Sequence, residues 1–240
     1  MKRVLVVIPT YNESENITRI IPEVLAKSTS EYEFNVLVVD DNSPDGTAGL
    51  VEGLGNPHVY IIKREKKNGL GTAYIVGFKF AIEKGFDYVY EMDADFSHDP
   101  KYLPEFLAKM EEGYDLVVGS RYINGISVVN WPISRLFLSY FANIYTRIIT
   151  GLKVKDTTAG FMCYDVHVLK NINLDNVRSN GYSFQIEMKY KYYVRKLKIT
   201  EIPILFIDRR AGRSKMSRKV VYEAFFVVWK LKFKSVFGKL

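Results

Sequence analysis

Two closely spaced aspartates in the segment MDADFSHDP, residues 92–100, could bind a metal ion. Asp93 and Asp95 directly follow an apolar run that predicts a β-strand. Side chains at i and i+2 of an extended chain point the same way, so the two carboxylates repel each other by roughly 2 to 3 kcal/mol. Mg²⁺ or Mn²⁺ would relieve that repulsion, because these ions take oxygen ligands, commonly one or two carboxylates plus substrate phosphates. The spacing therefore predicts a divalent cation that binds a diphosphate.

Helix capping explains other aspartates but not this pair. Asp99 immediately precedes a proline, which favours the first position of a helix, so Asp99 is the better candidate for an N-cap. In VVDDNSPDGT, residues 38–47, Asp45 could cap the next predicted helix in the same way. Asp40 and Asp41 adjoin an apolar strand and cannot both be caps, so they remain candidates for a ligand site.

The elements that position these residues alternate along the chain. Apolar, β-branched runs predict strands at residues 4–8, 34–39, 59–62, 88–92 and 116–118. Helical patterns lie between them, at residues 15–27, 47–53, 70–84 and 100–112. Strands that are apolar on both faces predict a mostly parallel sheet covered by helices on both sides. We expect an α/β, Rossmann-like three-layer sandwich that forms one domain over residues 1–240.

The second half of the chain is less regular. It contains a polar loop at residues 121–132 and an amphipathic helix at about 133–149. A short segment around 161–165, a helix near 183–196, a strand at 199–206 and a basic C-terminal helix from about 217 follow. In open parallel sheets, ligands bind at the carboxyl ends of the strands. The predicted strands end in polar groups, at residues 9–13, 40–45, 93–95 and 119–121. We expect these groups to converge on one rim of the sheet.

Composition excludes several classes of protein. The chain has 240 residues, of which 48% are hydrophobic and 25% charged, as in ordinary globular proteins. The single cysteine, Cys163, excludes an internal disulfide and a cysteine-rich zinc site. No window approaches the eighteen apolar residues of a membrane span. The absence of a Walker sequence and of GxGxxG argues against P-loop and NAD-binding proteins.

The net charge of +7 is unevenly distributed. Residues 209–240 hold ten lysines and arginines against one acid, Glu223. Such a segment indicates a polyanionic partner, a membrane surface or simply solubility.

Seven motifs together carry a resemblance to a known family. In chain order they are PTYNE, VVDDNSPDGT, KNGLGTAY, MDADFSHDP, GSRY, NWPISR and RRAGRSK. The set resembles family 2 glycosyltransferases of the GT-A fold, and within them the dolichol-phosphate (polyprenol-phosphate) mannose synthases. The resemblance covers nearly the whole chain, which we expect to lack the transmembrane extension of some members.

The resemblance implies a role for each matching residue. It divides the chain into a nucleotide-sugar half, residues 1–120, and an acceptor half with the basic helix, residues 121–240. The guanosine of GDP-mannose would contact Pro9, Tyr11, Glu13, Val38 and Asp40. The diphosphate would contact Asp93, Ala94 and Asp95, together with Arg209 and Lys215. Mg²⁺ or Mn²⁺ would bind Asp93, Asp95 and Ser97, the last through a water because serine replaces a longer glutamine of some relatives. The acceptor phosphate would contact Arg121, Arg135 and Ser139.

The chemistry of a phosphate acceptor fits two of these residues. A phosphate monoester has a second pKa near 6, so it arrives mostly as a dianion and needs no general base. It does need positive charge, which the guanidinium groups of Arg121 and Arg135 supply in bidentate geometry. With Asp95 as the principal metal ligand, we predict a single in-line displacement with inversion that yields a mannosyl phosphate lipid.

Aromatic and other apolar residues predict how the enzyme reaches a lipid. Beside Arg135 they are Trp131, Phe137, Leu138, Tyr140 and Phe141, and in the basic tail they are Phe225, Phe226, Trp229, Phe233 and Phe237. Such helices can lie in a membrane interface. Aromatics at helical spacing are more often core residues, and we expect this of Phe225 and Phe226. We expect a peripheral enzyme on the cytoplasmic side of a membrane, with a small membrane-anchoring subunit as a candidate partner.

Three alternatives stay open. One is a UDP-glucose-dependent polyprenyl-phosphate glucosyltransferase, since few contacts decide between glucose and mannose. Another is a different family 2 enzyme, although the chain has no QxxRW signature of a polymer synthase. The third is a nucleic-acid-binding module, which would use the basic tail. Such a module leaves the aspartate clusters without a purpose, so we expect no nucleic-acid partner.

Overall fold

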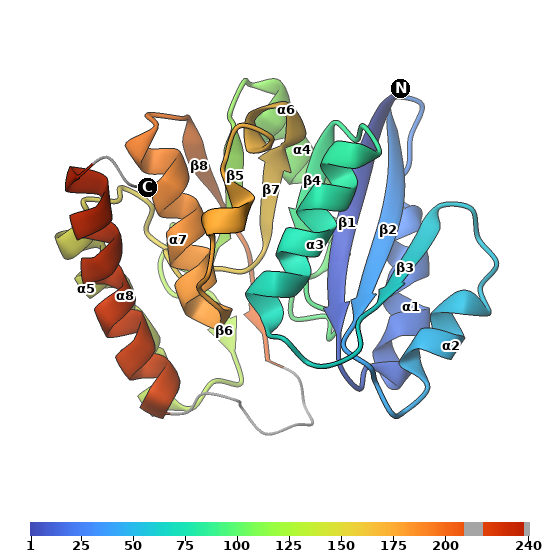
Figure 1. Cartoon of the computed structure of the whole chain (residues 1–240), viewed down its shortest axis with the longest axis horizontal. Coiled ribbons are helices and arrows are strands. Elements are labelled where there is room, and N and C mark those ends of the chain that lie inside the picture. Colours follow the sequence, from blue (N-terminus) through green and yellow to red (C-terminus); the bar gives the residue numbers. More distant parts are fainter. Residues whose placement is uncertain (209–217, 238–240) are drawn as a thin grey trace.

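The computed structural model describes residues 1–208 and 218–237 and is built on a seven-stranded sheet. The strand order is β3-β2-β1-β4-β7-β5-β8 (Figure 1). The strands are β1 (Lys2–Thr10), β2 (Tyr32–Asp40), β3 (Val59–Lys63), β4 (Tyr88–Glu91), β5 (Leu116–Ser120), β7 (Met162–Asp165) and β8 (Ile199–Pro203). All neighbours pair in parallel except β7, which runs antiparallel to both β4 and β5. The predicted mostly parallel sheet is confirmed.

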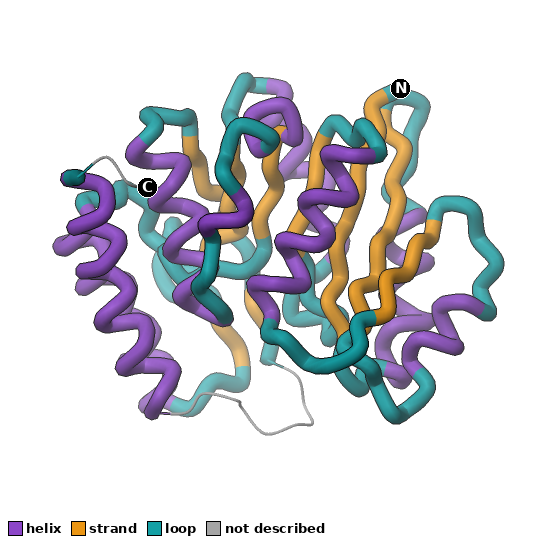
Figure 2. The backbone as a smooth tube through the Cα atoms, viewed as in Figure 1, coloured by secondary structure: helices purple, strands orange, loops and turns teal. Residues whose placement is uncertain are grey.

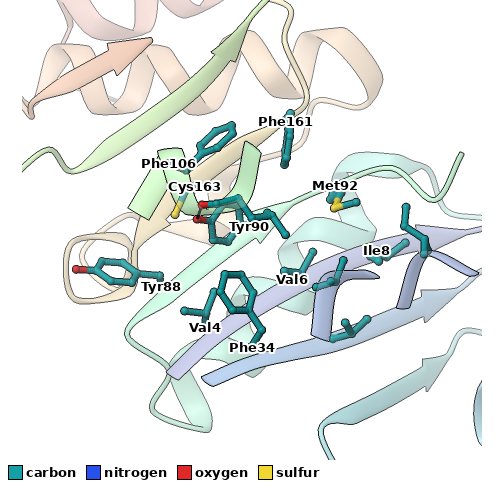
Figure 3. Close-up of a cluster of buried hydrophobic side chains, with 14 of the residues drawn as sticks. Val4, Val6, Ile8, Phe34, Tyr88, Tyr90, Met92, Phe106, Phe161 and Cys163 are labelled. Carbon is teal, nitrogen blue, oxygen red and sulfur yellow. Dashed lines mark hydrogen bonds between the residues drawn. The ribbon is translucent and has the colours of Figure 1, made fainter. Parts of the chain in front are cut away.

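Helices cover both faces of this sheet. They are α1 (Ser14–Leu25), α2 (Thr47–Glu52), α3 (Leu70–Glu83), η1 (Pro100–Tyr102), α4 (Leu103–Glu111), α5 (Ile133–Thr150), α6 (Val166–Leu169), η2 (Leu174–Asn176), α7 (Gly181–Val194) and α8 (Arg218–Val236). Because successive strand residues point to opposite faces, Val4, Val6 and Ile8 of β1 pack in one cluster with α1 and α4 (Figure 3). Leu5 and Val7 pack on the other face, in a cluster with α3 and α7. The expected three-layer sandwich is therefore confirmed.

Beyond β8, α5 and α8 form an additional helical layer. They lie side by side at one end of the molecule (Figure 2), and α8 packs against both α5 and α7. A small cluster joins them through Leu152, Ile186, Tyr190, Val228 and Leu231. Among the described residues, no helix combines the length and apolarity needed to cross a bilayer.

The structure corrects one prediction about α8. Phe225 and Phe226 are 46% and 68% exposed and are not core residues. Val228 and Leu231, three residues apart, are buried instead and define the inward face of the helix. Phe225, three residues before Val228, stacks on Tyr145 of α5 with 4.8 Å between ring centres but stays partly exposed, whereas Phe226 is more exposed.

A second difference concerns the strand predicted over residues 199–206. It is two strands, because β8 ends at Pro203 and Phe206 begins β9 (Phe206–Ile207). Proline has no N–H to continue the ladder. β9 pairs in parallel with β6 (Val128–Val129), so the loop before α5 is tied to the chain that follows β8.

Two helical glycines test how closely the layers are packed. A Cβ added to Gly77 of α3 would lie 2.4 Å from Cγ1 of Val7, whereas one added to Gly49 of α2 meets no atom within 4 Å. We expect Gly77→Ala to lower the free energy of unfolding by about 1 to 3 kcal/mol through overpacking. Gly49→Ala should raise it by about 0.5 to 1 kcal/mol. Urea denaturation measures both, and equal effects of the two substitutions would contradict the close contact of α3 with β1.

Candidate active site

A cavity of about 390 Å³ opens at the carboxyl edge of the parallel strands. Its walls come from the ends of β1, β4 and β5, from the segment that enters β7, and from the first turns of α7. Of the residues predicted to contact the donor, six line it: Pro9, Tyr11, Glu13, Asp93, Ala94 and Asp95. The expected convergence of strand ends on one rim is confirmed.

Two residues at the end of β2 that were predicted to contact the donor do not line the cavity. Val38 is fully buried in the core and does not line the cavity. Asp40 is 1% exposed and lies below the cavity, where it accepts hydrogen bonds from Oγ1 of Thr10 and Oγ of Ser43 at 2.7 and 2.6 Å. Asp41 is the acid of this strand end that lines the cavity. The Asp-Asp pair of the sequence contains Asp41, but only the backbone path shows which of the two acids lines the cavity.

Asp41 is held in place by Arg64. The Nε of Arg64 donates to Asp41 at 2.5 Å, and its Nη1 donates to Oγ1 of Thr72 at 2.6 Å. Burial raises the pKa of Asp41, although the charge of Arg64 opposes the shift. From the same loop as Arg64, the ammonium of Lys67 lies 4.0 Å from the centre of the Tyr11 ring. These contacts connect the loop before α3 to the ends of β1 and β2.

The turn after β4 fixes the two aspartates of the predicted metal site. Oδ1 of Asp95 accepts hydrogen bonds from the backbone N–H of Ser97 at 3.1 Å and from its hydroxyl at 2.6 Å. The N–H of Asp93 donates to Nδ1 of His98 at 3.0 Å. Burial lowers the pKa of His98, although the charges of Asp93 and Asp95 act to raise it. Asp99 accepts from the N–H of Lys101 at 2.9 Å, which confirms Asp99 as an N-cap.

These donor atoms fit a hard divalent cation. In residues 1–208 and 218–237 there is no cluster of three or more acidic, histidine or cysteine side chains that could hold a metal alone. Two carboxylates, Asp93 and Asp95, line the cavity instead. Mg²⁺ is commonly bound in this way, with substrate phosphates and waters as its remaining ligands. The role of Ser97 stays a prediction, since its hydroxyl donates to Asp95 in this structure.

Arg121 forms a buried ion pair at the opposite side of the cavity. Its Nε and Nη2 donate to the two carboxylate oxygens of Asp156, both at 2.7 Å, and its backbone N–H donates at 3.0 Å. Arg121 is 5% exposed and Asp156 is fully buried. Burial by itself would lower the pKa of Arg121. The charge and hydrogen bonds of Asp156 have the larger combined effect and raise the pKa of the guanidinium. Arg121 thus remains a fixed cation at the wall of the cavity.

Arg135 lies next to Arg121 and has unused hydrogen-bonding capacity. Its Nη1 donates to Asp208 at 2.5 Å, and the guanidinium lies 4.1 Å from the centre of the Trp131 ring. Within the described part of the chain, the buried Nε of Arg135 and Nε1 of Trp131 have no hydrogen-bond partner. Ser139, the third predicted acceptor residue, accepts a hydrogen bond from the hydroxyl of Tyr122 at 2.8 Å.

A second, apolar cavity of about 230 Å³ adjoins the first. The two share four lining residues: Arg121, Arg135, Thr158 and Tyr182. The remaining lining comes mostly from α5, with Leu138, Phe141 and Tyr145, and from Phe225 of α8. A polar cavity therefore opens into an apolar groove past two arginines. Arg209 and Lys215, predicted to contact phosphates, lie outside the described residues.

Comparison with known proteins identifies the family. Residues 5–172 match the model of glycosyl transferase family 2. The protein is a family 2 glycosyltransferase. It is 44% identical over 225 residues to an undecaprenyl-phosphate mannosyltransferase of Micrococcus luteus, covering 92% of this chain and 90% of that one. It is 43% identical over 230 residues to a polyprenol monophosphomannose synthase of Mycolicibacterium smegmatis, covering 95% and 86%.

A solved structure supports the fold of this glycosyltransferase. Glucosyl-3-phosphoglycerate synthase of Mycobacterium tuberculosis, in complex with Mn²⁺, UDP-glucose and phosphoglyceric acid, superposes with a TM-score of 0.71. The sequence identity is 16%, and the match covers 97% of this chain and 80% of the other. The expected GT-A fold is confirmed.

Beneath the cavity, the glycosyltransferase contains a buried polar network that the sequence did not reveal. Glu91, fully buried at the end of β4, accepts hydrogen bonds from Tyr164 at 2.5 Å and from Gln185 at 2.7 Å. Burial raises the pKa of Glu91 to about 8, against the effect of both hydrogen bonds. Burial also lowers the pKa of Lys189 to about 8, and the ammonium donates to the carbonyl of Ala159 at 2.7 Å. The partners are too far apart in sequence for a local motif to predict them.

The Arg121–Asp156 pair can be tested by comparing a buried with an exposed ion pair. Asp156→Asn leaves a buried guanidinium without its counter-charge, so the free energy of unfolding should fall by about 3 to 5 kcal/mol. Asp175→Asn is the control, because Asp175 pairs with Lys79 on the surface at 79% and 54% exposure. Asp175→Asn should lower the free energy of unfolding by about 1 kcal/mol or less. Equal losses in urea denaturation would contradict the structural role of the buried pair.

Proposed function

We propose that this glycosyltransferase transfers mannose from GDP-mannose to a polyprenyl or dolichyl monophosphate, with Mg²⁺ or Mn²⁺. The observation that carries the proposal is the junction of the polar cavity with the apolar groove at Arg121 and Arg135. A lipid phosphate has the matching chemistry, an apolar chain that ends in an anion. The names of the two curated relatives, at 44% and 43% identity, support a mannosyl donor and a polyprenyl-phosphate acceptor.

The donor is proposed to lie across the ends of β1, β2 and β4. Glu13 and Asp41 line the nucleoside end of the cavity. Guanine presents N–H donors at N1 and at its 2-amino group, which carboxylates can accept, and this favours GDP over UDP. Asp93 and Asp95 would hold the cation and diphosphate, and a bound cation would neutralise charge on the departing GDP.

The acceptor phosphate is proposed to lie between the two arginines. The unpartnered N–H groups of Arg135 and Trp131 would donate to its oxygens, and the guanidinium of Arg121 would add fixed positive charge. One phosphate oxygen then forms a bond to the anomeric carbon while the bond from that carbon to GDP breaks. The displacement inverts the anomeric centre. No side chain has to remove a proton from the nucleophile, because it arrives as an anion.

Exposed apolar side chains beside the groove support contact with a membrane. On α5 they are Ile133, Phe137, Leu138, Tyr140, Phe141 and Ile148, and on or just after α8 they are Phe225, Phe226, Trp229, Phe233 and Phe237. Lysines of α8 lie among them, as in helices that bind anionic lipid surfaces. We infer peripheral binding on the cytoplasmic side of the membrane, with a small membrane-anchoring subunit as a further candidate partner.

The transfer reaction itself is the experiment that tests the proposal. Purified protein is incubated with labelled GDP-mannose or UDP-glucose, a short polyprenyl phosphate and Mg²⁺ or Mn²⁺. We expect label to enter the lipid from GDP-mannose and only with a cation present. Transfer from UDP-glucose alone would replace the proposal with the glucosyltransferase alternative.

Asp95 and Asp99 provide a matched test of metal binding in one turn. Asp95→Ala should lower transfer by about a thousandfold or more, since it removes a carboxylate that holds cation and diphosphate, and should leave the fold intact. Asp99→Ala removes only a helix cap, so it should cost about 0.5 to 2 kcal/mol of stability and retain activity. Rate assays and thermal unfolding distinguish the two effects. An active Asp95→Ala variant would disprove the metal assignment.

Arg135 and Arg147 provide a test of acceptor binding in one helix. Arg135→Ala should raise KM for the lipid phosphate by about tenfold or more, because a charge-assisted hydrogen bond is lost. KM for GDP-mannose should change less than threefold, roughly the effect of a distant substitution. Arg147, exposed on α5 and outside both cavities, is the control. Equal increases of both KM values in Arg135→Ala would argue against an acceptor role.

A further inference from the structure

Gln185 presents an unused hydrogen-bond acceptor beside the donor cavity. It lies in the second turn of α7, is 2% exposed and lines the cavity. Its Nε2 donates to Oε2 of Glu91 at 2.7 Å. Its Oε1 is buried and has no hydrogen-bond partner among the described residues. Buried acceptors in proteins are nearly always satisfied, so an exception bordering a cavity points to a ligand.

Glu91 contacts the amide nitrogen of Gln185, which leaves the amide oxygen as the unused atom. Glu91 is fully buried, and its other oxygen accepts a hydrogen bond from the hydroxyl of Tyr164 at 2.5 Å. Tyr164 is itself held by edge-to-face contact with Phe78, at 5.0 Å between ring centres. In the structure Nε2 of Gln185 donates to Oε2 of Glu91, and the amide oxygen points the other way. The acceptor atom is thereby kept away from Glu91.

The order of the strands places Gln185 between the two proposed substrates. β7 lies between β4, which ends at the metal aspartates, and β5, which ends at Arg121 (Figure 1). The segment that enters β7, with Thr158, Ala159 and Gly160, lines the cavity in this interval. A Cβ on Gly160 would lie 3.4 Å from Nε2 of Gln185 and 3.7 Å from Cε1 of His98. Gln185 therefore borders the space between the diphosphate and the acceptor phosphate.

We propose that Oε1 of Gln185 accepts a hydrogen bond from a hydroxyl of the transferred hexose and thereby selects the sugar. Glu91 is the positioning residue that orients it. The inference rests on the proposed function. A carbonyl oxygen needs a donor, which the sugar hydroxyls supply and an ionised diphosphate does not. The nucleobase is proposed to lie at the opposite end of the cavity, beside Glu13 and Asp41.

Tyr192 offers a matched control on the same helix. Its hydroxyl is also buried without a partner among the described residues. Its ring packs in the apolar cluster on the α3 and α7 face of the sheet and lines neither the donor cavity nor the groove. Tyr192→Phe thus removes an equally unused polar atom that faces no proposed ligand.

The experiment combines donor analogues that lack one sugar hydroxyl with enzyme variants that lack the amide of Gln185. GDP-mannose and its 2-, 3-, 4- and 6-deoxy analogues are compared as donors for the wild type, Gln185→Met and Tyr192→Phe. For the wild type and Tyr192→Phe, kcat/KM should fall about 10- to 100-fold for the analogue that lacks the contacting hydroxyl. For Gln185→Met, the kcat/KM values of that analogue and of GDP-mannose should lie within about threefold of each other, because neither donor can form the hydrogen bond to the missing amide oxygen.

A purely structural role of Gln185 predicts a different result. It would lower the rates for all donors together and leave the discrimination as in the wild type, which would overturn the inference while the proposed function stands. If the wild type transfers no mannose from GDP-mannose, the proposed function fails first and the inference with it. Should Gln185→Met fail to fold, Gln185→Asn serves instead. It withdraws the amide oxygen by one methylene, so unchanged discrimination in that variant would also overturn the inference.

Discussion

The buried ion pair between Arg121 and Asp156 is the contact on which the acceptor half of the site depends. Desolvating two charges is costly unless the pair is close and fully hydrogen-bonded, and here the carboxylate accepts three bonds from Arg121 alone. The N–H of Asp156 in turn donates to Glu201 of β8 at 2.9 Å. The next residue, Thr157, donates twice to Asn143 of α5. One pair thus ties β5, β8, α5 and the entry to β7 together.

Acidic side chains predominate at one end of the sheet edge. Carboxylates line the cavity at β1, β2 and β4 together with Lys67, while Arg121 and Arg135, paired with Asp156 and Asp208, lie at β5 and α5. The acidic end can bind a cation and the N–H groups of a nucleobase. The positively charged end can bind an anion. Two substrates that both carry phosphate would repel each other in water, and fixed opposite charges offset that repulsion. The apolar groove begins only past the arginines, where a lipid chain would leave the site.

Sequence patterns predicted the elements well because they are local properties. Apolar runs located the strands, and the rule that ligands bind at strand ends located the cavity. Asp99 was predicted as a cap from its neighbour alone. That Asp41 lines the cavity and Asp40 does not was not predicted, because it depends on the turn of the backbone after β2. Phe225 and Phe226 were assigned to the core because spacing alone does not show how much of each ring the neighbouring helix covers.

Long-range partners were beyond prediction for a different reason. Glu91 and Gln185 are 94 residues apart, and Arg121 and Asp156 are 35 apart. Such pairs are set by the strand order, in particular by the antiparallel insertion of β7 between β4 and β5. A buried glutamine or aspartate in a helical or loop pattern has no distinct signature of its own. Only the fold brings these side chains to the same cavity.

The central claim is that the nucleophile is the phosphate of a lipid bound past the two arginines. The most direct measurement compares transfer of labelled mannose from GDP-mannose to polyprenyl monophosphate and to the free polyprenol of the same chain length. The account predicts rapid labelling of the phosphate and none of the alcohol, because Arg121 and Arg135 supply positive charge for an anionic nucleophile and the alcohol carries no charge. Equal labelling of both lipids would contradict it.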